Sequence, residues 1–455
     1  MTQTGEMLAK IWQALGGQAA HLAHLRETGQ GSLTSAFALS DFAAASTGAA
    51  GLALAELVAA QGGPFPEVSI DRRLASMWFA KSIRPLGWAL PPQWDAIAGN
   101  YEARDGWIRL HTNAPHHRAA ALRVLGVEND RALVSQAVAR WDCAGLEEAV
   151  VAAGGCAARM MGLAEWRAHE QGASVGAEAL VARRASGTHT GTAFGRAGRP
   201  LEGLRVLDLT RVLAGPVATR FLAGFGANVL RIDPPYWNEP AVLPEVTIGK
   251  RRARLDLHAS ADRAIFEGLL GQADVLVHGY RADALAHRGY DEATRLRLAP
   301  GLIDVALDAY GWTGPWQARR GFDTIVQMST GLAAREMDVS RSRKPVALAV
   351  QALDYGTGYL IAAAVLRGLT ERLATGQTRQ ARLSLARTAA FVAEHPMLEA
   401  SEPLASETAE DLASDTEVTH WGPARRLKAP VAIVGCEMKW DLPAGELGDS
   451  AASFD

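Results

Sequence analysis

Leu204-Arg-Val-Leu-Asp-Leu209 is followed directly by Thr210-Arg-Val-Leu-Ala-Gly-Pro216, and these two segments decide the fold. The first is a short run rich in Val and Leu, which is typical of a buried strand. The second ends in Pro216, and proline is favoured in the first turn of a helix because its missing N–H would have no partner there. Together the two segments predict a strand that leads into a helix.

The same alternation continues along the chain. Further strands are predicted at 228–232, 274–277 and 302–307, and helices at 216–225, 260–272 and 291–298. Strands that alternate with helices indicate a parallel sheet with helices on both faces. We therefore predict an α/β fold, with a doubly wound, Rossmann-like parallel sheet as the large domain and a smaller α+β domain beside it.

Shifts in composition divide the chain into four segments. The stretch 186–200 is rich in Gly, Ser and Thr, lacks apolar periodicity and is predicted to be a linker. Before it, 1–185 is mostly helical and contains the small α+β unit, with a predicted hairpin that turns at Asp105-Gly106. After it, 201–395 forms the large domain, and 396–455 forms an acidic connection and a C-terminal return strand.

A weak internal repeat links the two halves. Asp41 precedes a helix of small residues and then Val68-Ser-Ile-Asp-Arg72, while Asp354 precedes a similar helix and then Leu383-Ser-Leu-Ala-Arg387. The Asp-to-Ser spacings are 28 and 30 residues. The repeat indicates that one structural element occurs twice.

The composition is that of an ordinary globular chain, with 48% hydrophobic and 21% charged residues. A net charge of −3 provides no basic excess for binding nucleic acid. The longest uncharged apolar stretch, 42–55, is too short to span a bilayer, and the N-terminus shows no export signal. Three cysteines without a CxxC pattern exclude a disulfide scaffold and a cysteine zinc site. We therefore expect a cytoplasmic protein with no nucleic-acid partner, no membrane partner and no metal.

Asp354 is the strongest candidate for a catalytic residue. It stands in Gln351-Ala-Leu-Asp-Tyr-Gly-Thr-Gly358, immediately before an apolar helical run. Aspartate at a helix start is most often only a cap. Here Gly356 and Gly358 would leave the helix start bare for a ligand, and the positive helix end would keep the carboxylate ionised as a nucleophile.

Other motifs carry weaker signals. The loop after the first strand could form an anion site at a helix start, but it lacks a GxGxxG pattern, so nicotinamide binding has little support. Gly249-Lys-Arg-Arg252 is either a solvated basic turn or a phosphate-binding cluster. His116-His117 are predicted to face solvent on a helix, which disfavours metal binding there.

Seven segments form a recognisable series between about residues 200 and 390: Leu201 to Pro216, Gly226-Ala-Asn-Val-Leu-Arg-Ile232, Gly249-Lys-Arg251, Ala273-Asp-Val-Leu-Val277, Tyr310-Gly-Trp-Thr-Gly-Pro315, Gly321-Phe-Asp323 and Asp354-Tyr-Gly-Thr-Gly358. In this order they resemble the family III CoA-transferases. That family includes formyl-CoA:oxalate and carnitine CoA-transferases and the α-methylacyl-CoA racemases.

The resemblance implies that Asp354 is the catalytic aspartate of a CoA-transferase. Its carboxylate would attack an acyl-CoA thioester, and an aspartyl-CoA thioester would then pass CoA to an acceptor carboxylic acid. CoA would be a substrate and not a permanently bound cofactor. The positions that match the family's CoA contacts are Leu213, Ala214, Lys250, Arg251, Leu255, His258, Gly279, Tyr280, Arg281, Tyr310 and Gly311, with Lys250 and Arg251 as phosphate partners. Family dimers interlock, so a homodimer is expected.

Some positions depart from the family pattern. Pro234-Pro235 stand where members often have a basic residue that grips CoA phosphates, and Phe322 stands where the racemases need a histidine. The small-domain pattern resembles the family's second half but comes first here, so the chain looks permuted and partly duplicated, and Asp41 is expected to be structural. CoA transfer is the first expectation. The alternatives are a CoA-binding homologue without catalysis, an acyl-CoA racemase or isomerase, and an NAD-dependent dehydrogenase.

Overall fold

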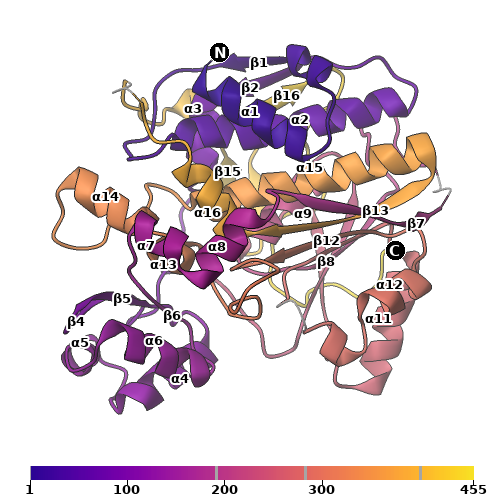
Figure 1. The fold of residues 1–455 in the computed structure, drawn as a ribbon. Coiled ribbons are helices and arrows are strands. Elements are labelled where there is room, and N and C mark those ends of the chain that lie inside the picture. The colour runs from indigo at the N-terminus through magenta and orange to yellow at the C-terminus, as the bar shows by residue number, and fades with distance from the viewer. Residues whose placement is uncertain (1, 190–192, 281–283, 399–401) are drawn as a thin grey trace.

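The computed structural model describes residues 2–189, 193–280, 284–398 and 402–455. Its central sheet consists of β7 (Ala182–Thr188), β8 (Arg205–Leu209), β9 (Asn228–Asp233), β10 (Lys250–Arg254), β11 (Val275–His278), β12 (Ile303–Asp308) and β13 (Gln377–Ser384). The strands lie in the order β10-β9-β8-β11-β12-β13-β7, and only the edge strand β7 is antiparallel (Figure 1). This is the strand order of a doubly wound Rossmann sheet. The predicted α/β fold is confirmed.

Both faces of the sheet are covered, because successive residues of a strand point to opposite sides. Val206 of β8 belongs to the core beneath α9 (Ala214–Gly224) and α15 (Ala352–Thr375). Leu207, the next residue, belongs to the core beneath α11 (Ser260–Gln272), which packs beside α12 (Glu292–Leu298). The carboxyl ends of β8 and β9 lead into the loops that form the candidate site.

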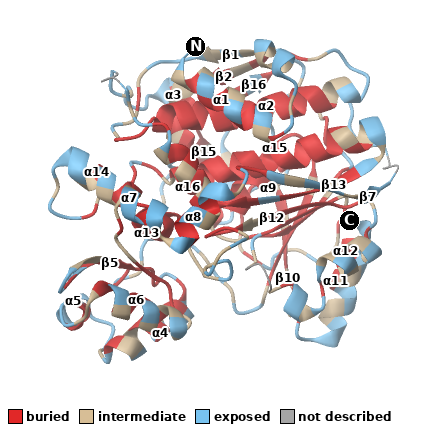
Figure 2. Ribbon diagram, in the orientation of Figure 1, coloured by how far each residue is buried: buried red, intermediate tan, exposed pale blue. Residues whose placement is uncertain are grey.

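The N-terminal segment packs on the outer side of α15. It contains α1 (Gln3–Ala14), the 3₁₀ helix η1 (Ala19–His24), β1 (Leu25–Thr28), α2 (Leu39–Ala60), β2 (Val68–Asp71) and α3 (Arg72–Trp78). Helix α2 is longer than the apolar stretch marked out in the sequence, and by length and composition alone it could cross a membrane. In this fold it is buried from Leu39 to Leu57, and it lies against α15, α1 and β2 (Figure 2).

The internal repeat corresponds to a structural duplication. One copy is α2–β2–α3, and the other is α15–β13–α16, where α16 spans Leu385–Ala393. The residues before the long helices, Ala38 and Gln351, have nearly the same backbone angles: φ −74°, ψ 61° and φ −79°, ψ 63°. Ala38 and Gln351 are 313 residues apart in the sequence, and Asp71 and Ser384, the N-caps of the short helices, are also 313 residues apart. Ser384 therefore aligns with Asp71, and the predicted match to Ser69 is two residues out of register.

The strands around the two copies agree as well. Strand β2 lies between the parallel β1 and the antiparallel β16 (Val431–Ile433), and β13 lies between the parallel β12 and the antiparallel β7. The C-terminal return strand thus pairs with the N-terminal copy and not with the central sheet.

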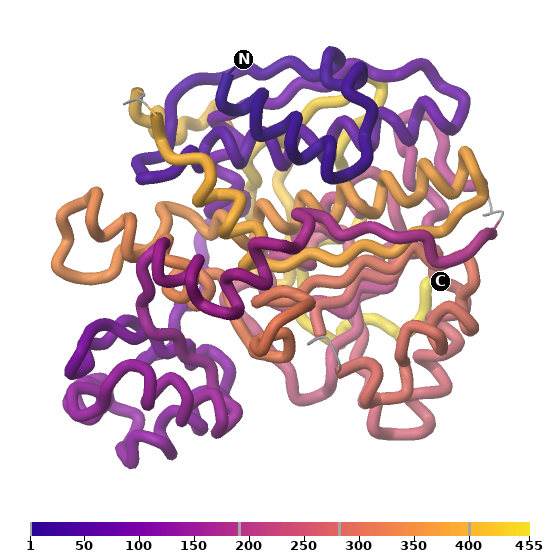
Figure 3. The backbone as a smooth tube through the Cα atoms, viewed as in Figure 1, coloured from indigo at the N-terminus to yellow at the C-terminus, as the bar shows by residue number. Residues whose placement is uncertain are grey.

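A small domain with its own core projects from the large one (Figure 3). It is built from β4 (Gly99–Ala103), β5 (Gly106–Leu110), α4 (Pro115–Leu125), α5 (Arg131–Val138), α6 (Cys143–Ala152) and β6 (Ala157–Arg159). The predicted hairpin is present, because β4 and β5 pair across Asp105-Gly106. Segment 1–185 also contains α1, α2 and α3, which pack in the layer beside α15 and not in the small domain.

The predicted linker begins too early, because β7 continues to Thr188 and pairs with β13.

The C-terminal segment is held by a buried carboxylate: Glu245 accepts hydrogen bonds from Ser82 and from Arg220, and lies 3.5 Å from Arg426. The remaining elements are β3 (Ile83–Pro85), α7 (Leu163–Ala168), α8 (Glu170–Ala177), α10 (Leu243–Val246), η2 (Ala286–Arg288), α13 (Asp323–Ser329), α14 (Leu332–Ser340), η3 (Ala409–Asp411), β14 (Glu417–Thr419) and β15 (Gly422–Arg426).

Candidate active site

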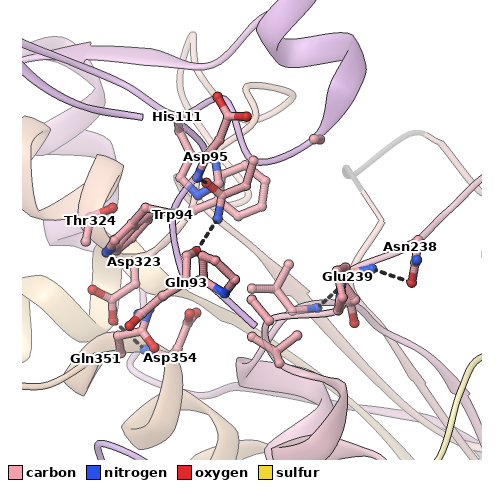
Figure 4. Close-up of a pocket in the computed structure, with 18 of the residues that line it drawn as sticks. Gln93, Trp94, Asp95, His111, Asn238, Glu239, Asp323, Thr324, Gln351 and Asp354 are labelled. Atoms are coloured by element: carbon pink, nitrogen blue, oxygen red, sulfur yellow. Dashed lines mark hydrogen bonds between the residues drawn. The ribbon is translucent and has the colours of Figure 1, made fainter. Parts of the chain in front are cut away.

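A pocket of about 220 Å³ opens at the first turn of α15, and Asp354 lines it (Figure 4). The loops after β8 and β9 contribute Val212 and 237–242. The start of α13 contributes 322–324, and the region around the small domain contributes Trp94 and His111 among others. The pocket therefore lies at the carboxyl ends of the strands, where open α/β sheets bind their ligands.

The loop between β8 and α9 is held in an unusual conformation. Val212 has φ 64°, in the left-handed region that a β-branched residue rarely adopts. Its N–H donates to Glu239 at 2.9 Å, and Arg231 and Trp237 donate to the same carboxylate at 2.6 and 2.9 Å. Backbone strain of this kind persists only where the surroundings enforce it, and it is concentrated at functional sites.

Two carboxyl groups meet at the start of α15. Asp323 Oδ2 accepts the backbone N–H of Asp354 at 3.0 Å, and Gln327 donates to Oδ1. No described residue donates a hydrogen bond to the Asp354 carboxylate, which is left facing the pocket. Burial raises the pKa of Asp354 well above its ordinary value, and the neighbouring charge of Asp323 raises it further. Burial and the like charge thus oppose the helix dipole, which was predicted to favour the ionised form of this group.

The two glycines after Asp354 serve helix packing and not ligand access. A Cβ on Gly356 would lie 2.2 Å from the ring of Phe42 on α2. A Cβ on Gly358 would lie 2.5 Å from the carbonyl oxygen of Ala214 on α9. Their predicted role as an open approach to the nucleophile is therefore wrong: they let α15 lie close to α2 and α9.

Aromatic side chains form the wall on the small-domain side. The ring of His111 stacks on Phe322 with a centroid distance of 4.0 Å, and Trp94 meets it edge-on at 6.0 Å. His117 is buried behind Phe322, contrary to the prediction that it faces solvent. Burial lowers the pKa of both His111 and His117 to about 3, so both imidazoles are neutral at physiological pH.

The basic cluster does not reach the pocket. Lys250 is completely buried, and its Nζ bonds Asp208, Pro216 and Thr219 at 3.1, 2.9 and 2.7 Å. Arg251 follows it at the beginning of β10, the end of the strand opposite the pocket, and donates to Asn228 at 3.1 Å. Their assignment as phosphate partners is therefore wrong, and the segment is a strand instead of a basic turn.

The other predicted CoA contacts fall into two groups. Those that are buried are Leu213, Ala214, Leu255, Tyr310 and Gly311, and the Tyr310 hydroxyl is bonded to Ser329 at 2.8 Å. Those that are at least partly accessible are His258, Gly279 and Tyr280, which follow the carboxyl ends of β10 and β11. Arg281 lies outside the described residues.

Arg211 is a basic residue near the carboxyl ends of the strands, and it was not among the predicted site residues. Its guanidinium lies 4.5 Å from the ring centroid of Trp237 and 5.3 Å from that of Tyr280. It is 3.9 Å from Asp233, a carboxylate that Arg231 already pairs with at 2.7 Å. The only signal in the sequence is its place in the loop after the first strand.

Asp41, the counterpart of Asp354 in the N-terminal copy, is not free. Arg72 pairs with both of its oxygens, and the Thr4 hydroxyl donates to one of them at 2.9 Å. This geometry agrees with the structural role expected for Asp41.

Residues 201–425 match the sequence model of CoA-transferase family III. The acetyl-coenzyme A transferase nodX of Hypoxylon pulicicidum is 36% identical over 192 residues, which cover 41% of this chain and 32% of nodX. The succinyl-CoA:glutarate CoA-transferase of Mus musculus is 32% identical over 192 residues, which cover 39% of this chain and 44% of the relative. A crystal structure of Rv3272 from M. tuberculosis is 27% identical, with a TM-score of 0.39, over 43% of this chain and 57% of that one.

The chain thus spans less than two thirds of the length of these relatives. The matched residues contain β8 to β13, the strained loop at Val212, and the Asp323–Asp354 pair. Residues 201–425, just under half of the chain, therefore carry the sequence pattern of CoA-transferase family III.

Proposed function

We propose that this protein transfers CoA between an acyl-CoA and a carboxylic acid, with Asp354 as the nucleophile. The observation that carries the proposal is that the Asp354 carboxylate lines the pocket and accepts no hydrogen bond from the described residues. A carboxylate that is buried and unpaired is poorly solvated, and it reacts more readily than one that water or a cation stabilises.

The reaction has four steps that mirror one another. The Asp354 carboxylate attacks the thioester carbonyl carbon, the C–S bond breaks, and CoA leaves as a thiolate with the electron pair. The thiolate then attacks the aspartyl carbonyl of the mixed anhydride, which releases the donor acid and forms aspartyl-CoA. An acceptor carboxylate attacks this thioester and expels the thiolate, which attacks the new acyl group and frees Asp354. The acyl group is never released to water as an activated species.

The Asp323–Asp354 pair supports this role. Asp323 fixes the first turn of α15 by accepting the Asp354 N–H, so the nucleophile is held in place without a bond to its own oxygens. CoA would lie along the carboxyl ends of the strands, near Leu213, Ala214, Gly279 and Tyr280. Arg211 is available there for a phosphate, in place of Lys250 and Arg251.

Trapping of the intermediate tests the proposal. Purified protein is incubated with acetyl-CoA or succinyl-CoA, treated with hydroxylamine and digested, and the peptides are weighed. A hydroxamate on the Asp354 peptide is expected for the wild type and for Asp41→Asn, and its absence is expected for Asp354→Asn. CoA binding without any modified Asp354 peptide would instead favour the homologue that has lost catalysis. Homodimer formation and a cytoplasmic location stay predictions.

A further inference from the structure

Arg109 and Thr324 connect the small domain to the helix that carries Asp323. Arg109 belongs to β5, and its Nε donates to the Thr324 hydroxyl at 3.0 Å. Its Nη1 donates to Asn100 at 2.8 Å, and its guanidinium lies 4.8 Å from the ring centroid of Trp94. The proposed reaction does not yet use either Arg109 or Thr324.

The hydrogen atom of the Thr324 hydroxyl has no acceptor among the described residues. A hydroxyl group can donate one hydrogen bond and accept others. The Thr324 oxygen accepts from Arg109, and no bond in which this hydroxyl donates is present in the described part of the chain. Thr324 is 7% exposed, and it lines the pocket together with Asp354. Its free proton is therefore available to a ligand in that pocket.

Arg109 supplies this hydroxyl with a positive charge that forms no ion pair among the described residues, although Asp323 acts on it at longer range. No carboxylate oxygen of a described residue lies within ion-pair distance of the Arg109 guanidinium, which is nine-tenths buried. Burial lowers its pKa to about 10, so it remains protonated at neutral pH. Neither lysine nor arginine occurs among the described residues that line the pocket. Arg109 thus places a cation directly behind the pocket-lining Thr324, to which its Nε is hydrogen-bonded.

We propose that Thr324 donates a hydrogen bond to the acyl oxygen of the substrate at Asp354, and that Arg109 positions and polarises the Thr324 hydroxyl. This inference rests on the proposed CoA transfer. When the Asp354 oxygen bonds to the carbonyl carbon, the π electrons move onto the carbonyl oxygen, which then carries the negative charge. The Thr324 hydroxyl stabilises that oxygen until the C–S bond breaks and the thiolate leaves. Donors that are already oriented toward such an oxygen act mainly on the transition state.

The test measures steady-state exchange of CoA, with acetyl-CoA or succinyl-CoA as donor, for Thr324→Val, Thr324→Ser and Arg109→Lys. Thr324→Val keeps the shape of the side chain but cannot donate, so kcat should fall about 100-fold while KM changes little. Thr324→Ser restores the hydroxyl and should recover most of kcat. Arg109→Lys keeps the charge but not the geometry of the guanidinium, and its kcat should lie between those of Thr324→Val and Thr324→Ser.

The matched control is Thr330→Val. Thr330 lies at the other end of α13, does not line the pocket, and bonds the Val326 carbonyl at 2.7 Å. It should retain the wild-type kcat. Thermal unfolding of each variant separates loss of fold from loss of function, and Thr324→Ser keeps the test decisive if the valine variant unfolds. A Thr324→Val enzyme that keeps kcat within about threefold of the wild type would overturn the inference. A wild type that neither exchanges CoA nor forms the Asp354 hydroxamate would overturn the proposed function itself, and the subsite with it.

Discussion

Arg72 grips the Asp41 carboxylate through both oxygens, with Nη1 2.7 Å from Oδ1 and Nη2 2.8 Å from Oδ2. Asp41 lies in the first turn of α2, at the same place as Asp354 in the first turn of α15. In the second copy, the position of Arg72 is occupied by Leu385, the first residue of α16. The two aspartates thus share a backbone setting but differ in their counter-charge, and only Asp354 is left free to react.

The Arg72–Asp41 pair should be needed for stability and not for exchange. Arg72→Leu leaves Asp41 as a nearly buried carboxylate without its cation, which should lower the free energy of unfolding by about 3 kcal/mol. Urea denaturation measures the loss. The double variant Arg72→Leu/Asp41→Leu removes both charges and should recover a large part of it. If Arg72→Leu unfolded at the same urea concentration as the wild type, the pair would have no structural role.

The fold was predictable wherever a strand is a continuous apolar run. β8, β9, β11 and β12 are of this kind, because a central parallel strand is buried on both faces. β10 escaped prediction because Lys250, Arg251 and Arg252 are basic. Lys250 is neutralised by Asp208 and Arg252 by Asp449, at 3.1 and 2.7 Å, and the second partner lies 197 residues away in sequence. β7 escaped because an edge strand needs no apolar face.

The site was predictable only in part. Asp354 stands out through the glycines that follow it, although those glycines turned out to pack against Phe42 and Ala214. The pocket wall made by Trp94 and His111 was missed, and so was Arg109 behind it, because no local pattern shows that β5 will meet α13. The buried pairing of Lys250 was missed for a similar reason, since a basic run carries no sign of the carboxylate that neutralises it.

Gly356 should be intolerant of a side chain because of Phe42. Gly356→Ala places a methyl group 2.2 Å from the Phe42 ring, and relieving the clash should cost about 1–3 kcal/mol of stability. Thermal unfolding checks this. Phe42→Leu in the same chain makes room for the methyl group and should restore part of the stability. If the double variant is stable but no longer forms the Asp354 hydroxamate, the glycine is needed at the site itself and not only for packing.

Asp354→Asn should stabilise the fold at neutral pH. The folded state raises the pKa of Asp354, so it binds this proton more tightly than the unfolded chain does. The free energy of unfolding therefore falls as pH rises from about 4 through the folded pKa, by about 1.4 kcal/mol for each unit of the shift. Asparagine has no proton to lose. Urea unfolding of the variant and the wild type should differ clearly at pH 7.5 and hardly at pH 4, and an equal difference at both would contradict the raised pKa.

The exchange reaction should lose activity on acidification at a higher pH than an ordinary aspartate would require. Only the ionised form of Asp354 can attack a thioester, and its raised pKa moves the loss of that form toward neutral pH. Asp323→Asn removes the neighbouring charge but keeps an oxygen that can accept the Asp354 N–H. The acidic limb of kcat/KM should then move to lower pH. Rates measured from pH 4.5 to 8.5 with one acyl-CoA donor give the acidic limb of the wild type and that of Asp323→Asn. A limb that stays in place in Asp323→Asn would show that burial alone sets the pKa of the nucleophile.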